Sequence, residues 1–237
     1  PRIVLLNKCD VADPAATKRW IAAFEAQGKT ALAVDCRSGK GLSAFLPTVQ
    51  QVLKKTIEKN TQRGMAGKPL RLMGGGIPNT GKSSFINRMA GKNRAKVADK
   101  AGVTRQNQWF AVGGGIELLD TPGILWPKFD DPEVGKRLAF TGAVKDDVLD
   151  IEELACYLMD YLAAHYADTL TERYKIEVEP GDTGYELLEK AGRKRGFLMR
   201  GAQVDTERMA RILLDEFRAG KLGRFTLETA PTEEVTP

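Results

Sequence analysis

The stretch of this sequence with the clearest chemistry is Gly76–Ser83, which fits the pattern GxxxxGK(S/T). Apolar residues just before it predict a short strand, and the spacing of Phe85, Ile86 and Met89 after it predicts a helix. A glycine-rich turn between a strand and a helix presents backbone N–H groups and the positive end of the helix to a phosphate. We therefore interpret this stretch as a phosphate-binding loop rather than a chance turn.

Two side chains at the end of this loop carry the predicted chemistry. Lys82 is placed to reach the β- and γ-phosphates of a nucleoside triphosphate, and the hydroxyl of Ser83 is placed to bind Mg²⁺. The loop residues that we expect to contact the nucleotide are Asn79, Thr80, Gly81, Lys82, Ser83 and Ser84.

A second candidate site lies near the start of the chain, where the apolar run Ile3–Leu6 predicts a buried strand that ends in Asn7-Lys-Cys-Asp10. This NKxD pattern is the guanine-reading motif of GTP-binding proteins. The carboxylate of Asp10 can accept two hydrogen bonds from guanine that adenine does not offer. We expect Asn7 to bond within the site and the stem of Lys8 to pack over the base. Cys36 follows the next predicted strand and is expected in the loop under the base.

A third pattern, Asp120-Thr-Pro-Gly123, closes a predicted strand. Asp120 can hold Mg²⁺ through water, while the N–H of Gly123 can bond a γ-phosphate and release it after hydrolysis. Thr104 is the candidate for a second switch that caps Mg²⁺. The predicted catalytic residues are therefore Lys82, Thr104 and Gly123, and the predicted Mg²⁺ ligands are Ser83, Thr104 and Asp120.

The organisation of the chain changes after these motifs. Strand patterns end near Asp130, and helical patterns follow at about 132–144, 150–165, 167–175, 182–193 and 205–219. Earlier in the chain, we expect one amphipathic helix over 42–58 and a polar linker over 59–68. The sequence predicts a nucleotide-binding domain over 1–129, a helical domain over 130–229 and a flexible tail over 230–237.

Composition favours a soluble protein with a polyanionic partner. The 237 residues carry a formal net charge of +5, and no apolar run approaches the length of a membrane span. Arg193, Lys194, Arg195 and Arg200 form a candidate RNA-binding surface, although any one basic cluster is more often a solvated face. Three scattered cysteines without a secretory signal indicate a reducing compartment, the cytoplasm or an organellar matrix. We expect a monomer with no membrane association.

The motifs stand in an unusual order. GTP-binding domains ordinarily place the phosphate loop first and NKxD last, whereas here NKxD comes first. In this order the motifs resemble those of the circularly permuted GTPases of ribosome assembly. The resemblance implies an α/β fold, a circularly permuted P-loop GTPase domain with a mostly parallel sheet and helices on both faces, followed by a small all-α domain. It also implies GTP or GDP with Mg²⁺, late maturation of the large ribosomal subunit precursor, rRNA contact, and an activating K⁺ bound near Asn79.

Several positions depart from this resemblance. Ala101 replaces a proline, Asp35 and Cys36 replace the usual Ser and Ala under the base, and Ile124 occupies the place of a water-positioning glutamine. The permuted fold also needs a further strand and helix, and a segment with a histidine for hydrolysis, all of which would precede Pro1. We expect slow intrinsic hydrolysis that the partner or the upstream segment accelerates, with no catalytic role for His165.

Two other functions fit part of this pattern. One is a non-catalytic, nucleotide-dependent RNA-binding module, which the absence of a water-positioning glutamine favours. The other is an ATP-using kinase or ATPase built on the same phosphate loop, against which the NKxD pattern argues.

Overall fold

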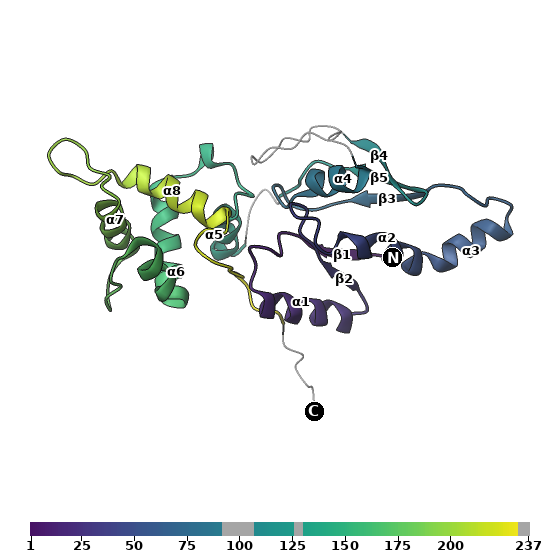
Figure 1. The fold of residues 1–237 in the computed structure, drawn as a ribbon, viewed down its shortest axis with the longest axis horizontal. Coiled ribbons are helices and arrows are strands. Elements are labelled where there is room, and N and C mark those ends of the chain that lie inside the picture. The colour runs from purple at the N-terminus through teal and green to yellow at the C-terminus, as the bar shows by residue number, and fades with distance from the viewer. Residues whose placement is uncertain (92–106, 126–129, 232–237) are drawn as a thin grey trace, which may run out of the picture. The chain divides into compact units, whose positions relative to one another are not determined.

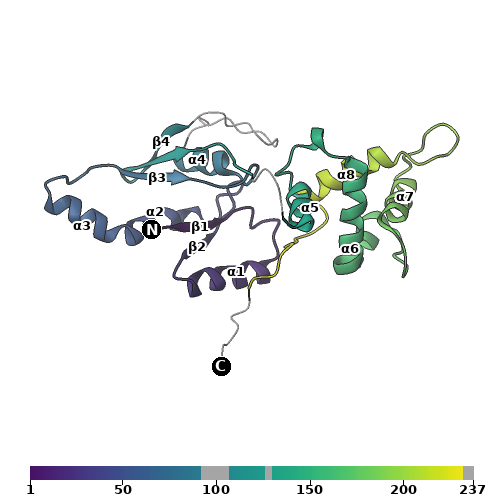
Figure 2. The ribbon, with the colours of Figure 1, turned by 180° about the vertical axis from the view of Figure 1, so that it is seen from behind.

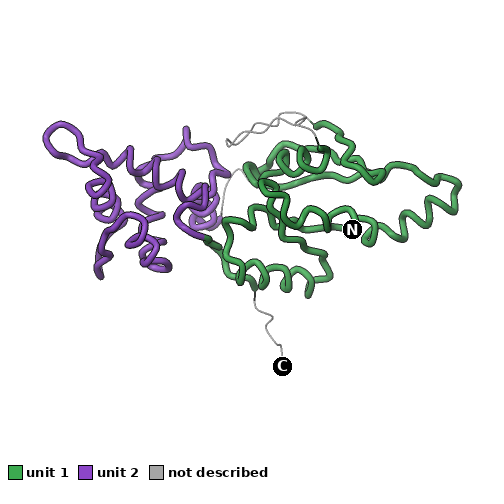
Figure 3. The backbone as a smooth tube through the Cα atoms, viewed as in Figure 1, with its two compact units in different colours: residues 1–125, 224–237 green, residues 126–223 purple. Residues whose placement is uncertain are grey.

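The structure is a computed structural model that describes residues 1–91, 107–125 and 130–231. Thr104 and Ala101 lie outside these ranges. The chain forms two compact units, shown in Figure 3: unit 1 comprises Pro1–Leu125 with Arg224–Pro237, and unit 2 comprises Trp126–Gly223.

Unit 1 begins with a parallel β-α-β arrangement. Strands β1 (Ile3–Leu6) and β2 (Thr30–Ala33) pair in parallel, and helix α1 (Pro14–Ala26) connects them. The carboxylate of Asp13 caps α1 by accepting the N–H groups of Ala15 and Ala16 at 2.6 and 2.9 Å. The predicted Asp-Pro start of this helix is confirmed.

A three-stranded sheet completes the strands of unit 1 among the described residues. Strand β5 (Ile116–Asp120) lies between β3 (Leu70–Gly74), to which it is parallel, and β4 (Gln108–Gly113), to which it is antiparallel. Helix α4 (Lys82–Ala90) packs against β4 and β5. The expected strand, glycine-rich loop and helix around the phosphate loop are all present (Figure 1).

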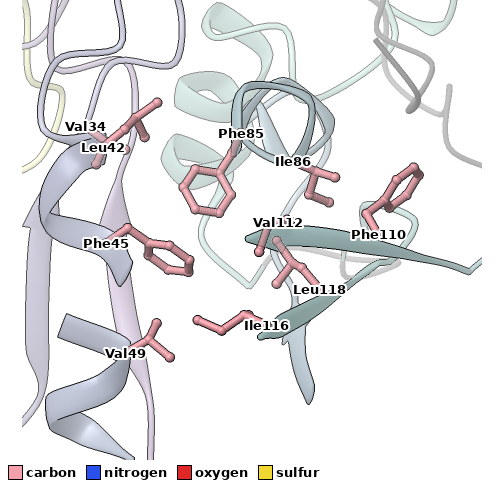
Figure 4. Packing of buried hydrophobic residues seen from close by; sticks show 10 residues of the cluster. All are labelled: Val34, Leu42, Phe45, Val49, Phe85, Ile86, Phe110, Val112, Ile116 and Leu118. Carbon is pink, nitrogen blue, oxygen red and sulfur yellow. The ribbon is translucent and has the colours of Figure 1, made fainter. Parts of the chain in front are cut away.

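One apolar core joins the early and late parts of unit 1. The edge of the Phe85 ring faces the Phe45 ring, with the ring centroids 4.8 Å apart. Figure 4 shows side chains from 34–49, from α4 and from the β4–β5 hairpin converging on this contact. The buried members are Val34, Leu42, Phe45, Val49, Phe85, Ile86, Phe110, Val112, Ile116 and Leu118. The segment that carries NKxD is therefore packed against the segment that carries the phosphate loop.

An open interval separates the two sheets of unit 1. Among the described residues β1 pairs only with β2, and β3 pairs only with β5, so each has one unpaired edge. A cavity of about 630 Å³ is lined by residues of both strands and by residues next to them, including Arg2, Asn7, Pro69 and Thr80. Met73 of β3, which also lines it, is 72% exposed.

The helix predicted over 42–58 is divided. The structure has a 3₁₀ turn η1 (Leu42–Ala44), α2 (Phe45–Val52) and α3 (Lys54–Gln62), with a break at Leu53. The predicted linker over 59–68 therefore starts too early, because its first four residues continue α3. Nothing in Lys-Asn-Thr-Gln stops a helix, and the turn comes only at Gly64, where φ is +73°.

Unit 2 is built from helices: α5 (Pro132–Phe140), a 3₁₀ turn η2 (Asp146–Val148), α6 (Ile151–Tyr174), α7 (Gly184–Lys194) and α8 (Thr206–Arg218). The break predicted between helices over 150–165 and 167–175 is confirmed: the backbone within α6 is non-helical at Tyr166, where φ is −149° and ψ is 43°. Fully buried apolar residues of α6, α7 and α8 form the core, among them Leu158, Leu162, Leu187, Leu188, Met209 and Leu213. No helix among the described residues combines the length and apolar composition needed to cross a bilayer.

A polar cluster holds the helices of unit 2 in register. The buried carboxylate of Glu216 on α8 accepts hydrogen bonds from Arg173 and from the hydroxyl of Tyr174, the latter at 2.9 Å. Hydrogen bonding from Arg173 lowers the pKa of Glu216 despite its burial. Arg218 pairs with Asp146 at 2.8 Å and also bonds carbonyls at the end of α5.

We predict that Gly184→Ala destabilises unit 2. A Cβ at this first residue of α7 would overlap the carbonyl of Cys156 on α6, so the two helices would have to separate. The expected loss in free energy of unfolding is about 3 kcal/mol, the upper part of the range for overpacking. Chemical denaturation measures this loss. Tyr185→Ala on the same helix is the control: Tyr185 is 51% exposed, and its loss should cost less than about 0.5 kcal/mol. Equal stability of the two variants would contradict the prediction.

Candidate nucleotide-binding site

The phosphate loop has the backbone geometry that its sequence predicts. Asn79 and Gly81 have φ values of 57° and +87°, in the left-handed region, and Gly81 caps the amino end of α4. Lys82 is the first residue of that helix and folds back over the loop, donating to the carbonyl oxygens of Gly76 at 3.0 Å and Ile77 at 2.7 Å. Burial lowers the pKa of Lys82, while the charge of Asp120 acts in the opposite direction. The loop thus holds the ammonium group of Lys82 at the site where phosphates would bind.

The two described candidates for Mg²⁺ lie side by side. The hydroxyl of Ser83 donates to a carboxylate oxygen of Asp120 at 3.0 Å, and Asp120 is only 2% exposed at the end of β5. Hard oxygen donors of this kind suit Mg²⁺, which is usually held by one or two protein oxygens together with phosphate oxygens and water. The described residues contain no cluster of three or more His, Cys, Asp or Glu that could hold a metal alone. The pair therefore fits an ion that arrives with a phosphorylated ligand.

The segment after Asp120 lies directly on the phosphate loop. The Thr121 hydroxyl donates to the carbonyl oxygen of Gly74 at 2.6 Å. The N–H of Ile124 donates to the carbonyl oxygen of Gly76 at 3.3 Å. Gly123 approaches the backbone of Pro78 so closely that an added Cβ would lie 2.6 Å from its Cα. The Ile124 side chain is 74% exposed and has no group that could orient water. A shift of Gly123 toward Pro78 would therefore displace the phosphate loop.

The amide of Asn7 joins the predicted guanine-reading motif to the phosphate loop. Its Nδ2 donates to the carbonyl oxygen of Thr80 at 2.7 Å, and its Oδ1 accepts the N–H of Cys36 at 3.3 Å. Lys8 adopts a left-handed φ of 59°, and the N–H of Cys9 donates to the carbonyl of Val34 at 3.2 Å. One side chain therefore connects the loops that follow β1, β2 and β3.

The loop expected under the base is organised by Asp35, a residue that sequence reasoning treated only as a departure. Its carboxylate accepts the N–H of Arg37 at 2.7 Å and that of Ser38 at 3.1 Å. Burial alone would raise the pKa of Asp35, but these bonds and the Ser38 hydroxyl hold it below its ordinary value. Burial also raises the pKa of the Cys36 thiol to about 11. An Asp at a strand end followed by Ser three residues later is a turn signature that could have predicted this role.

Sequence reasoning also missed Arg88 on α4. Its guanidinium donates to the carbonyl of Ser38 at 3.0 Å, so the helix that begins in the phosphate loop also holds the base loop. No local sequence pattern signals a contact between residues fifty positions apart.

The candidate RNA-binding residues all lie in unit 2. Arg193 pairs with Glu189 at 2.9 Å, and Arg195 lies over the Tyr174 ring and near Glu216. These contacts give Arg195 a structural role within the unit. Lys194 and Arg200 are exposed, as is Arg193. His165, exposed on α6, has its ring 4.7 Å from that of Tyr161.

We predict that Gly81→Ala disrupts the site while the protein stays folded. The new Cβ would overlap the Asn7 amide, at a position already strained for a side chain. Gly91→Ala is the matched control, because Gly91 has a similar φ of +64° but nothing within 4 Å of an added Cβ. Each substitution should cost about 1–2 kcal/mol of backbone strain. Only Gly81→Ala should lower nucleotide turnover, by about 100-fold. Equal turnover of the two variants in a phosphate-release assay would show that the close approach of Gly81 to the Asn7 amide is not needed for turnover.

Comparisons with known proteins agree with this geometry. Residues 72–192 match the family model described as 50S ribosome-binding GTPase. Similar curated proteins include ribosome biogenesis GTPase A of Bacillus cereus, 43% identical over 97% of this chain and 77% of the relative. The protein of the same name from Priestia megaterium is 44% identical over 100% of this chain and 82% of the relative.

Solved structures resemble this chain as well. The GDP-bound structure of TM YlqF matches with a TM-score of 0.63 and 28% identity, covering 96% of this chain and 82% of that one. The GNP-bound YlqF from T. maritima matches with a TM-score of 0.60 and 27% identity, covering 96% and 81%. The circularly permuted P-loop fold predicted from motif order is confirmed. This chain therefore belongs to the ribosome biogenesis GTPase A family of GTP-hydrolysing enzymes.

Proposed function

We propose that this chain couples GTP binding and hydrolysis to docking on rRNA in the precursor of the large ribosomal subunit, late in its maturation. The observation that supports this most directly is the 2.7 Å hydrogen bond from Asn7 to the Thr80 carbonyl. It supports the proposal because the NKxD segment contacts the phosphate loop although 73 residues separate Asn7 from Thr80 in the sequence. The family model's description as a 50S ribosome-binding GTPase supports the choice of particle.

Each motif has a distinct task in this proposal. Asp10 accepts two hydrogen bonds from guanine, with Lys8 packed over the base and Cys36 beneath it. Lys82 and the N–H groups of the loop neutralise the phosphates. Ser83 and Asp120 hold Mg²⁺, which when bound neutralises charge on the β- and γ-phosphates. Two further assignments rest on resemblance: Thr104 as the second switch residue, and Asn79 as a ligand of K⁺.

The same site suggests why hydrolysis would need a partner. The residues that neutralise charge are in place, whereas Ile124 offers no group that could orient water. Gly123 and Ile124 contact the phosphate loop and directly precede unit 2 in the chain. We propose that docking on the particle completes the water-positioning geometry. A chain that binds GTP only as a clamp is the alternative, and it differs in showing no stimulated turnover.

The RNA surface is proposed to lie on unit 2, where Arg193, Lys194 and Arg200 are exposed. Contacts between lysine or arginine and phosphate release counterions, so binding through them weakens as salt rises. The formal net charge of +5 agrees with a polyanionic partner.

The test is GTP turnover by the purified chain with and without large-subunit precursor particles. We expect slow turnover alone and stimulation of at least about tenfold with particles. Lys194→Ala with Arg200→Ala should weaken particle binding and reduce the slope of log affinity against log salt by about 2. Lys54→Ala with Lys55→Ala on α3 is the control and should leave the slope unchanged. Nucleotide-dependent binding without stimulation would support the clamp, and fast turnover without particles would contradict the partner requirement.

We also propose that the interval between β1 and β3 can receive an extended segment as a further strand. Both strands have an unpaired edge among the described residues, and a cavity of about 630 Å³ is lined by both of them. An extended apolar segment would pair with both edges and cover Met73. It would lie beside the phosphate loop, because Thr80 and Lys82 also line the cavity.

This proposal predicts that one peptide can bind in the interval. The probes are peptides tiling the part of the Bacillus cereus relative that lies outside its match to this chain. We expect one of them to slow amide hydrogen exchange in both Ile3–Leu6 and Leu70–Gly74, because hydrogen bonds to a new strand protect these edges. A scrambled peptide of the same composition is the control. Protection of neither strand by any peptide at saturation would overturn the proposal.

A further inference from the structure

The chain returns to unit 1 after its last helix. Residues Arg224–Glu228, which we call the strap, lie beside the loop that leads into α1 (Figure 1 and Figure 2). The sequence prediction assigned 224–229 to the helical domain, whereas the structure places these residues in unit 1. The residues that separate α8 from the strap, 219–223, contain two left-handed glycines, Gly220 and Gly223. These turns end the helix and redirect the chain.

Three hydrogen bonds attach the strap to the loop before α1 and to α1 itself. The N–H of Phe225 donates to the carbonyl oxygen of Val11 at 3.0 Å. The hydroxyl oxygen of Thr226 accepts the N–H of Asp13 at 3.2 Å. The indole N–H of Trp20 donates to the carbonyl of Glu228 at 3.4 Å.

The first two of these bonds lie just after Asp10, whose carboxylate is proposed to read guanine. Val11 follows Asp10 directly, and Asp13 lies two residues further on, where it caps α1. On the amino side of Asp10 the loop is held by Asn7 and by the bond from Cys9 to Val34. The strap therefore anchors the carboxyl side of a loop whose amino side is anchored by the nucleotide site itself.

We propose that the strap is a positioning element for base recognition, with Thr226 and the N–H of Phe225 holding Asp10 in line with guanine. This inference rests on the proposed reading of guanine by Asp10. Two simultaneous hydrogen bonds to a base require a carboxylate held within a few tenths of an ångström, because hydrogen bonds weaken steeply with misalignment. Since the strap follows unit 2 in the chain, a force on that unit can reach the base loop through it.

The test compares affinities for GDP and for inosine diphosphate, which lacks the exocyclic amine that Asp10 would accept. Thr226→Val removes the acceptor for the Asp13 N–H at constant shape, Phe225→Pro removes the donor to Val11, and Thr226→Ser restores the hydroxyl. Thr229→Val, one residue beyond the strap and exposed, is the control. A lost hydrogen bond corresponds to about a fivefold change in a binding constant. We expect the preference for GDP to fall about fivefold in Thr226→Val and Phe225→Pro, and to be retained in Thr226→Ser and Thr229→Val.

Two further readouts separate the possible failures. Asp10→Asn must abolish the preference for GDP over inosine diphosphate; if it does not, the proposed base reading itself is wrong. If it does, and the strap variants bind both nucleotides with the wild-type ratio, the strap has no positioning role. An equal loss of affinity for both nucleotides would also overturn the inference, because it would show general weakening of the site. Thermal unfolding of each variant establishes that it is folded at the temperature of the binding assay.

Discussion

The site in unit 1 depends on one amide side chain. Asn7 donates to the carbonyl of Thr80 and accepts from the N–H of Cys36, so it ties together the loops at the carboxyl ends of three strands. In α/β sheets ligands bind at this edge, because the loops from parallel strands converge there. Gly81 allows the approach, since a Cβ at this position would overlap the amide. This bond is thus a direct link between the Asn7–Asp10 segment and the phosphate loop, in addition to the shared apolar core.

Circular permutation changes the connections of the chain and leaves these contacts intact. The core pairs Phe45 from the amino-terminal part with Phe85 of α4, and it supports both halves of the site from beneath. Unit 2 begins after Leu125 and ends before Arg224. Both of its connections therefore lie next to functional loops: Gly123 and Ile124 on one side, and the strap on the other. The proposed roles of both segments thus concern the two stretches of chain that connect the units.

Local chemistry determined what could be predicted from the sequence. Glycines, a terminal Lys-Ser and flanking apolar periodicity define the phosphate loop wherever it occurs, and the expected pairing of NKxD with it is present in the structure. Features that depend on contacts between distant residues leave no pattern in the local sequence, so they could not be predicted. The break at Leu53 and the return of the strap to unit 1 both depend on tertiary packing. Asp35 was treated as a weakness of the base loop, yet its carboxylate organises that loop.

The distribution of polar groups bears on how hydrolysis would be controlled. Phosphoryl transfer needs charge neutralisation and a positioned nucleophile. The first requirement is met by groups that are already held: Lys82 by two loop carbonyls, and Ser83 by a buried Asp120. The second requirement, a positioned water nucleophile, is not met by Ile124, because its apolar and exposed side chain cannot orient water. Our proposal of slow intrinsic hydrolysis rests on this contrast among the described residues, between charged groups that are already held and an apolar side chain at Ile124. The rate would then depend on whatever contacts the segment after Gly123, which is the segment that leads into unit 2.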